Sequence, residues 1–264
     1  MSSWKARVPR PSVGRWVVWI GLFTTLSAFL YWSFLGSEFS AQRLWRGVPQ
    51  LVSLFSSRMV PPEWPAAETL WQASLETLHT VVAGTFLGAL FAYPLGVLAA
   101  SNWTPTWIQL PTKAVLALIR SCPVLLLALL FISAFGLGAF PGMLAIAIHS
   151  IGVLGRYVAE EVEATDPRAL RAIKGTGASK LQVLQHGLVP QVLPQMLAHL
   201  AIRFEMNVRD ATILGVVGGG GLGFYVLLHI KQFHWERTGP FLLVIVLLVF
   251  GSEMLSWQIR KRLL

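Results

Sequence analysis

The sequence predicts an all-α integral membrane protein with about six transmembrane helices. Of its 264 residues, 55% are hydrophobic and 12% are charged, against roughly 25% charged in ordinary soluble domains. Three stretches, 16–37, 77–112 and 121–155, contain no Asp, Glu, Lys or Arg. About 20 apolar residues cross a bilayer as a helix, and continuous apolar runs without strict alternation favour helices over a barrel. These stretches therefore predict membrane-spanning helices.

The apolar runs and their boundaries place the six helices along the chain. The predicted helices lie at about 16–35, 75–100, 114–135, 142–162, from 191 onwards, and 240–259. A polar stretch that contains Pro61, Pro62 and Pro65, 38–73, follows the first helix, and a polar segment of about 163–190 precedes the fifth. No internal repeat or low-complexity tract is evident, so the chain is predicted to be a single transmembrane domain over 1–264.

The distribution of basic residues predicts the orientation. Lysine and arginine concentrate on the cytoplasmic side of membrane proteins. With both termini inside, the cytoplasmic segments hold 13 Lys and Arg and the outer segments hold 5. Lys5, Arg7, Arg10 and Arg15 precede the first apolar run as in a signal peptide, but no clear small-residue cleavage site follows it. We therefore expect a retained first helix and a multi-pass protein with cytoplasmic termini.

The same composition argues against two other kinds of protein. The formal charge of +9 could indicate a nucleic-acid partner, but basic residues that flank apolar segments are explained by membrane topology. Cys122 is the only cysteine, so the chain has no disulfide framework and no cysteine-based metal site. We predict no nucleic-acid partner and no bound metal.

The cytoplasmic segment 163–190 carries signals for two short helices. Asp166 followed by Pro167 is a favourable helix start, because Asp caps free N–H groups and Pro suits the first helical position. This helix would stop at Gly175 or Gly177, and Ser179 can cap a second one. On these residues alone, the segment is either a helical surface loop or a docking element.

The spacing within this segment resembles the EAA motif of ABC-importer permeases. Ala172, Gly177 and Pro190 match that pattern, whereas Arg171 replaces its glutamate. Ile173, Gly187 and Val189 also depart from it. The resemblance implies coupling helices that dock on an ATPase subunit, and it assigns this role to Leu170, Arg171, Ala172, Ile173, Gly177, Ala178 and Pro190.

The fifth predicted helix carries four charges at membrane depth. Such charges cost about 2.5–3.5 kcal/mol each on insertion scales and normally face a bundle interior or an aqueous path. Glu205 and Arg209 are four residues apart in the favourable order for an ion pair, either structural or functional. Arg203 and Asp210 have no obvious local partner, which favours a position along a translocation path.

A run of glycines, Gly218 to Gly221, follows these charges. Each glycine costs about 1 kcal/mol in a helix interior relative to alanine, so the run predicts a break in the helix. It is either an anion-binding nest of backbone N–H groups or a turn that permits close packing. No Gly-Lys-Ser/Thr follows it, so this chain is not expected to bind ATP.

Several motifs between about 75 and 260 resemble the phosphonate-type ABC permease family. They are Glu76-Thr77-Leu78, Pro94-Leu95-Gly96, Arg120-Ser-Cys-Pro123, Gly136-Leu-Gly138 with His149, Glu160-Glu161-x-Glu163, Glu205-x-Asn207-Val208-Arg209 and Ile213-Leu214-Gly215-Val216-Val217-Gly218 with the glycines after it. Val124 departs from an acidic residue often found after that proline. The glycine-rich end alone is less specific, because methionine-type permeases carry similar glycines.

The resemblance implies a type I ABC importer permease fold in a bacterial inner membrane. The implied partners are a second copy of the permease, two ATPase subunits that bind ATP and Mg, and a periplasmic substrate-binding protein. The implied cargo is a phosphonate, phosphite or related phosphorus oxyanion, with methionine or another small solute as the alternative. We expect the path to involve Arg203, Glu205, Asn207, Arg209, Asp210, Gly218, Gly219, Gly220 and Gly221.

Two other classes remain as competing hypotheses. An intramembrane enzyme would need a catalytic constellation, but neither His-Glu-x-x-His nor Gly-x-Ser-x-Gly occurs, and the six histidines are scattered. A structural membrane scaffold would not require buried charges and broken helices. We therefore predict a non-catalytic subunit without a cofactor of its own.

Overall fold

The protein is described here by a computed structural model that covers residues 13–37 and 39–263. The described residues form helices joined by loops, with no strand among them. Contacts divide the chain into two compact units, one that ends at Ser56 and one that begins at Ser57. The single domain over 1–264 stays a prediction. Lys5, Arg7, Arg10 and Glu38 lie outside the described residues.

The N-terminal unit contains one apolar and one amphipathic helix. Helix α1, Val13–Gly36, exposes apolar side chains all round, as a helix surrounded by lipid does. Helix α2, Ala41–Ser53, begins at Ser40, whose Oγ accepts a hydrogen bond from the Arg43 N–H at 3.3 Å. A π turn, η1 at Leu54–Arg58, follows. The polar stretch that the sequence predicted after the first helix therefore contains a capped helix.

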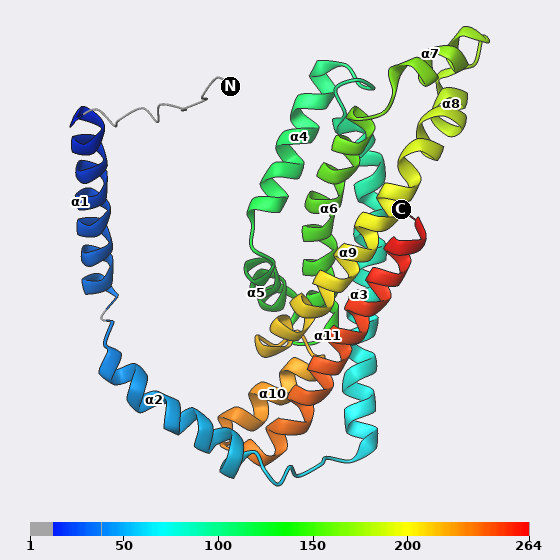
Figure 1. Cartoon of the computed structure of the whole chain (residues 1–264). Coiled ribbons are helices and arrows are strands. Elements are labelled where there is room, and N and C mark those ends of the chain that lie inside the picture. Colours follow the sequence, from blue (N-terminus) through cyan, green and yellow to red (C-terminus); the bar gives the residue numbers. More distant parts are fainter. Residues whose placement is uncertain (1–12, 38, 264) are drawn as a thin grey trace, which may run out of the picture. The chain divides into compact units, whose positions relative to one another are not determined.

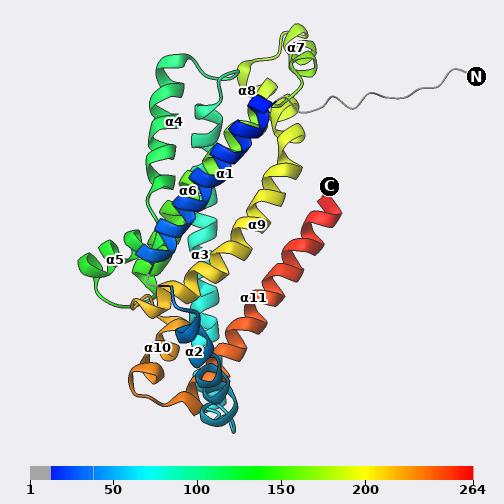
Figure 2. The ribbon, with the colours of Figure 1, turned by 60° about the vertical axis from the view of Figure 1, so that its left-hand side comes forward.

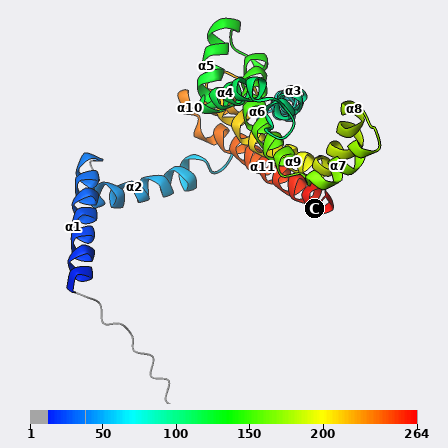
Figure 3. The same cartoon turned by 90° about the horizontal axis from the view of Figure 1, so that it is seen from above.

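The second unit is a bundle built on four long helices, which lie alongside one another in Figures 1 and 2. Its elements are α3 Ala67–Ala99, α4 Thr106–Ser121, α5 Val124–Phe135, α6 Ala139–Glu163, α7 Pro167–Gly175, α8 Lys180–Val183, the π turn η2 Leu184–Leu188, α9 Val189–Val216, α10 Gly221–Lys231 and α11 Trp235–Leu263. The short helices α7 and α8 project from one end, clear of the bundle when it is seen from above (Figure 3), and α10 closes the other end.

The number of membrane crossings agrees with the sequence prediction. Among the described residues, five helical stretches are long and apolar enough to cross a membrane, or six if the bent pair α4–α5 is one span. Helix α3 begins at Ala67, eight residues earlier than predicted, because the polar residues at its start continue the helix beyond the apolar core. Its 33 residues span about 50 Å, more than the roughly 30 Å of bilayer hydrocarbon.

The prediction of one continuous third helix over 114–135 is wrong. Helices α4 and α5 meet at an 84° bend. Pro123 has no backbone N–H and disfavours the helical conformation at the residue before it. Cys122 is accordingly extended, with φ −79° and ψ 118°. The apolar composition predicts helix on both sides, but the proline breaks it.

Close contact between α3 and α6 forms the centre of the bundle, and glycines permit it. A Cβ on Gly88 would lie 2.6 Å from Ser150 Cβ and 2.9 Å from the Ala147 carbonyl oxygen. A Cβ on Gly96 would lie 2.5 Å from Val158 Cβ. Small residues let helix backbones approach in membranes, where packing replaces the hydrophobic drive. Helices α4 and α9 pack against these two helices.

An ion pair ties the loop before α3 to the start of α11. The Arg237 guanidinium donates two hydrogen bonds to the Glu63 carboxylate, at 2.9 and 2.8 Å. These bonds hold the pKa of the Glu63 carboxyl below its ordinary value. The pair lies at the end of the bundle where α3 and α11 begin.

Candidate functional site

Two residues of α9 that the sequence left without partners bind each other. Arg203 and Asp210 are seven residues apart, two helical turns on one face, and Arg203 Nη2 lies 3.3 Å from Asp210 Oδ2. Arg203 Nε also donates to Ser150 Oγ on α6 at 3.0 Å. The expectation that they lack a local partner is therefore wrong. The Arg203 side chain is only 6% exposed, so its charge is held inside the bundle.

Asn207 extends this polar contact to a third helix. Its side-chain amide donates to Thr85 Oγ1 on α3 at 2.8 Å and to Ser150 Oγ on α6 at 3.1 Å. Asn207 is fully buried, and its Oδ1 has no hydrogen-bond partner among the described residues. The sequence did not single out Thr85 or Ser150, although small polar residues in apolar helices are the kind that bond across helices.

The predicted Glu205–Arg209 ion pair is confirmed. An Arg209 Nη2 hydrogen bond to Glu205 Oε1 links the two residues along α9, and the same nitrogen lies 4.0 Å from Glu253 Oε2 on α11. The Arg209 side chain is 46% exposed, whereas that of Glu205 is 12% exposed. Of the predicted path residues on α9, Arg209 is therefore the most accessible cation, but its charge is already balanced.

The glycine run breaks the helix as predicted. Helix α9 ends at Val216 and α10 begins at Gly221, and Gly220 has φ +77°, which favours glycine. The Leu222 N–H donates to Thr77 Oγ1 on α3 at 3.0 Å. A Cβ on Gly220 would overlap the Glu76 carboxylate. The run thus makes a close contact with α3, which favours the packing turn, while the anion-binding nest stays a prediction.

The capping signals of the cytoplasmic segment are confirmed. Asp166 Oδ1 accepts from the Arg168 N–H at 2.8 Å, and α7 ends at Gly175. Ser179 and Gln182 form a reciprocal capping box at α8. Between the helices, Gly177 has φ +83°, a conformation that L side chains rarely adopt. This glycine sets the reversal between α7 and α8.

Some of the coupling residues contact the π turn η2, and some line a cavity. A Cβ on Gly187 would lie 2.9 Å from Leu170 Cδ2 and 3.1 Å from Ile173 Cδ1, so these two side chains face η2. Arg171 and Leu170 both line a basic cavity of about 430 Å³. The cavity is lined by Asn102, Trp103, Pro167, Leu170, Arg171, Lys174, Ala178, Lys180 and Val183. Pro190 lies at the start of α9, directly after the π turn.

An all-helical bundle with five or six apolar stretches long enough to cross a membrane defines a multi-pass membrane protein within the described residues. Residues 92–259 match the family described as binding-protein-dependent transport system inner membrane component. The chain belongs to this family.

Its relatives include permeases named for phosphorus oxyanions. The chain is 33% identical over 222 residues to the phosphite transport system permease protein PtxC of Stutzerimonas stutzeri, across 84% of this chain and 80% of that protein. It is 37% identical over 228 residues to the phosphate-import permease protein PhnE of Mycolicibacterium smegmatis, across 86% of this chain. The match spans 43% of that second, longer relative.

Solved structures confirm the fold. The MetNI methionine ABC transporter, in inward-facing conformations, aligns with a TM-score of 0.68 at 19% identity, over 76% of this chain and 98% of that one. A bacterial alginate ABC transporter bound to its periplasmic protein aligns with a TM-score of 0.57 at 16% identity, over 93% and 96%. The type I ABC importer permease fold expected from the sequence is therefore present.

Proposed function

We propose that this chain is the membrane-spanning subunit of an ATP-driven importer of phosphite, a phosphonate or a related phosphorus oxyanion. The similarity to the phosphite permease PtxC across 84% of the chain carries this proposal. A methionine transport permease of Vibrio cholerae is 27% identical over 60% of the chain, a weaker and shorter match. The likeness to MetNI supports the fold and leaves the cargo open.

The proposed assembly contains two copies of this chain, two ATPase subunits and a periplasmic binding protein. In it, α7 and α8 dock on the ATPase, which binds ATP and Mg and carries out hydrolysis. The capped helices and the positive φ of Gly177 support this role, because they give the projecting segment the form of two short helices joined by a tight turn. Both termini would lie in the cytoplasm, on the same side as α7 and α8.

Reconstitution tests the proposal. The chain would be purified with its ATPase, placed in proteoliposomes and supplied with the binding protein and ATP. We expect uptake of phosphite or a phosphonate, and none of methionine. Methionine uptake without oxyanion uptake would overturn the cargo assignment, and failure to copurify with any ATPase would overturn the assembly.

A further inference from the structure

A charged cavity lies between α4 and α6, away from the path residues predicted on α9. Its volume is about 270 Å³. Its charged lining consists of three cations and two carboxylates, Lys113, Arg120, Arg156, Glu160 and Glu163. The remaining lining residues are apolar, Ala99, Leu116, Ala117 and Ala159. We call this cavity the α4–α6 groove.

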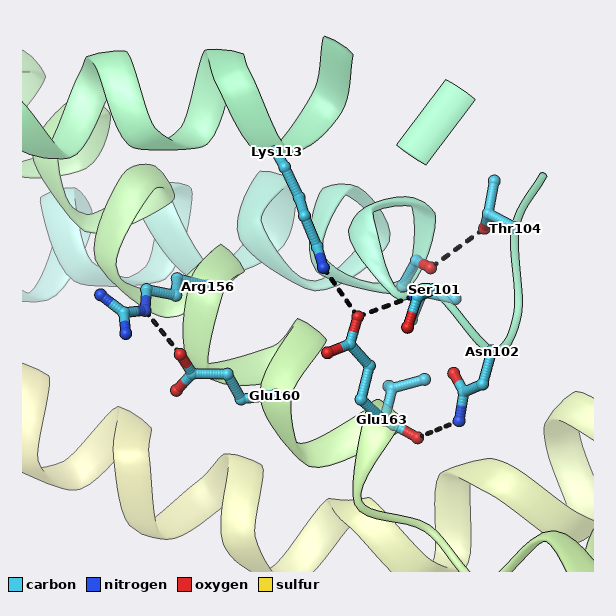
Figure 4. Close-up of polar contacts among 9 residues, drawn as sticks. Ser101, Asn102, Thr104, Lys113, Arg156, Glu160 and Glu163 are labelled. Atoms are coloured by element: carbon cyan, nitrogen blue, oxygen red, sulfur yellow. Dashed lines mark hydrogen bonds and ion pairs between the residues drawn. The ribbon is translucent and has the colours of Figure 1, made fainter. Parts of the chain in front are cut away.

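Two of the three cations in the groove are neutralised, as Figure 4 shows. Lys113 Nζ lies 2.8 Å from Glu163 Oε1, which also accepts from the Ser101 N–H at 2.8 Å. Arg156 Nε lies 2.6 Å from Glu160 Oε1. Within residues 13–37 and 39–263, Arg120 has no ion-pair partner. The groove therefore carries one uncompensated positive charge.

Arg120 lies at the end of the groove nearer the break between α4 and α5. Helices α4 and α6 run antiparallel, with Lys113 beside Glu163 at one end. A Cβ on Gly152 would lie 2.8 Å from the Arg120 backbone nitrogen, so Arg120 is level with Gly152. Seven residues separate Lys113 from Arg120, about 10 Å along the helix. The charged side chains thus follow one another along α4 and α6, from the loop between α3 and α4 toward the break between α4 and α5.

These charges need a polar surrounding that the isolated chain does not supply. Arg120 is exposed, and the side chains of Arg156 and Glu160 are 49% and 51% exposed. Charged side chains in membrane-crossing segments face water or protein rather than lipid. A guanidinium with free N–H groups in a polar path suits an oxyanion, which it can bind with two parallel hydrogen bonds.

We propose that the α4–α6 groove lines the oxyanion path and that Arg120 is the cation that binds the ion there. This inference rests on the proposed function. It places the free charge on α4, whereas Arg203 and Arg209 on α9 are each neutralised by a carboxylate. Lys113 and Arg156, whose charges are balanced by Glu163 and Glu160, bind an anion more weakly than Arg120. The ion can therefore leave Arg120 toward these residues.

Uptake by the complete reconstituted transporter tests the role of Arg120. We expect Arg120→Gln to lower phosphite uptake per ATP hydrolysed by at least about tenfold, since a hydrogen bond to a charged group is worth that much or more. Arg120→Lys should restore part of it, because the charge remains. The matched control is Arg262→Gln, an exposed cation at the end of α11. Wild-type phosphite uptake by Arg120→Gln would overturn the inference alone, whereas absence of oxyanion uptake by the wild type would overturn the proposed function.

Cysteine labelling gives a second readout that does not depend on transport. Cys122 is the only cysteine, so Ala117→Cys in a Cys122→Ser chain places a single thiol in the groove and keeps Arg120. We expect a membrane-impermeant cationic thiosulfonate to label it and phosphite to slow the labelling. An unlabelled thiol in a correctly assembled transporter, or labelling that phosphite does not change, would overturn the inference.

Discussion

Removal of Arg203 should destabilise the bundle by about 3 kcal/mol or more, because it leaves a carboxylate without its partner. In Arg203→Met, Asp210 loses the guanidinium 3.3 Å away, and Ser150 loses a hydrogen bond of 3.0 Å. Breaking a buried ion pair by removing one partner costs about 3–5 kcal/mol. The Asp210 side chain is 25% exposed, which places the loss toward the lower end of that range.

A double variant separates the pair's structural role from a role in the path. Replacing both partners, as in Arg203→Met with Asp210→Leu, should recover most of the lost stability, because no charge is then left unpaired. The control is Arg237→Met, which breaks a pair whose side chains are 45% and 54% exposed. Exposed pairs contribute little, so this control should lose much less stability than Arg203→Met.

Unfolding in mixed micelles, titrated with a denaturing detergent, measures these differences, and uptake is measured on the same proteins. If the pair is structural, the double variant regains both stability and uptake. A stable double variant that does not transport would show that these charges also serve the path. An Arg203→Met protein as stable as the wild type would refute the reasoning from burial.

Three further predictions concern local geometry. Gly177→Ala should lower ATP-coupled uptake, because φ +83° costs an L residue about 1–2 kcal/mol. The control Gly175→Ala, at a position with open space and no positive φ, should leave uptake unchanged. Equal uptake by the two variants would count against a role for the Gly177 turn. Gly88→Ala should lower the melting temperature, because overpacking costs about 1–3 kcal/mol and this cost exceeds the gain in helix propensity. The control Gly251→Ala, whose added Cβ meets no atom within 4 Å, should be neutral or stabilising. Because the pKa of Glu63 is lowered in the folded protein, its ion pair stabilises the protein at pH values above the ordinary carboxyl pKa, and this contribution is lost as pH falls through the folded-state pKa. Glu63→Gln should therefore flatten the acid side of a plot of melting temperature against pH. An unchanged plot would exclude this contribution.

Local patterns in the sequence predicted the features that depend on neighbouring residues. The apolar runs predicted about six crossings, and Asp166 and Ser179 were identified as helix caps. The Glu205–Arg209 pair followed from a spacing of four, because such residues are adjacent on any α-helix. The caps and the ion pair each lie within one helix or at its end, so helical geometry alone determines them.

Contacts between helices could not be predicted in this way. The hydrogen bond from Asn207 to Thr85 joins residues 122 positions apart, and Lys113 meets Glu163 across 50 positions. These contacts exist because glycines allow α3 and α6 to pack closely and because α4 packs antiparallel to α6. Composition placed charges in the membrane, but only the packing of the helices decided that Lys113 is paired with Glu163 and that Arg120 has no ion-pair partner among the described residues. The physical reason is that a side chain's charge balance depends on which helix faces it, and helix pairing is a property of the whole bundle.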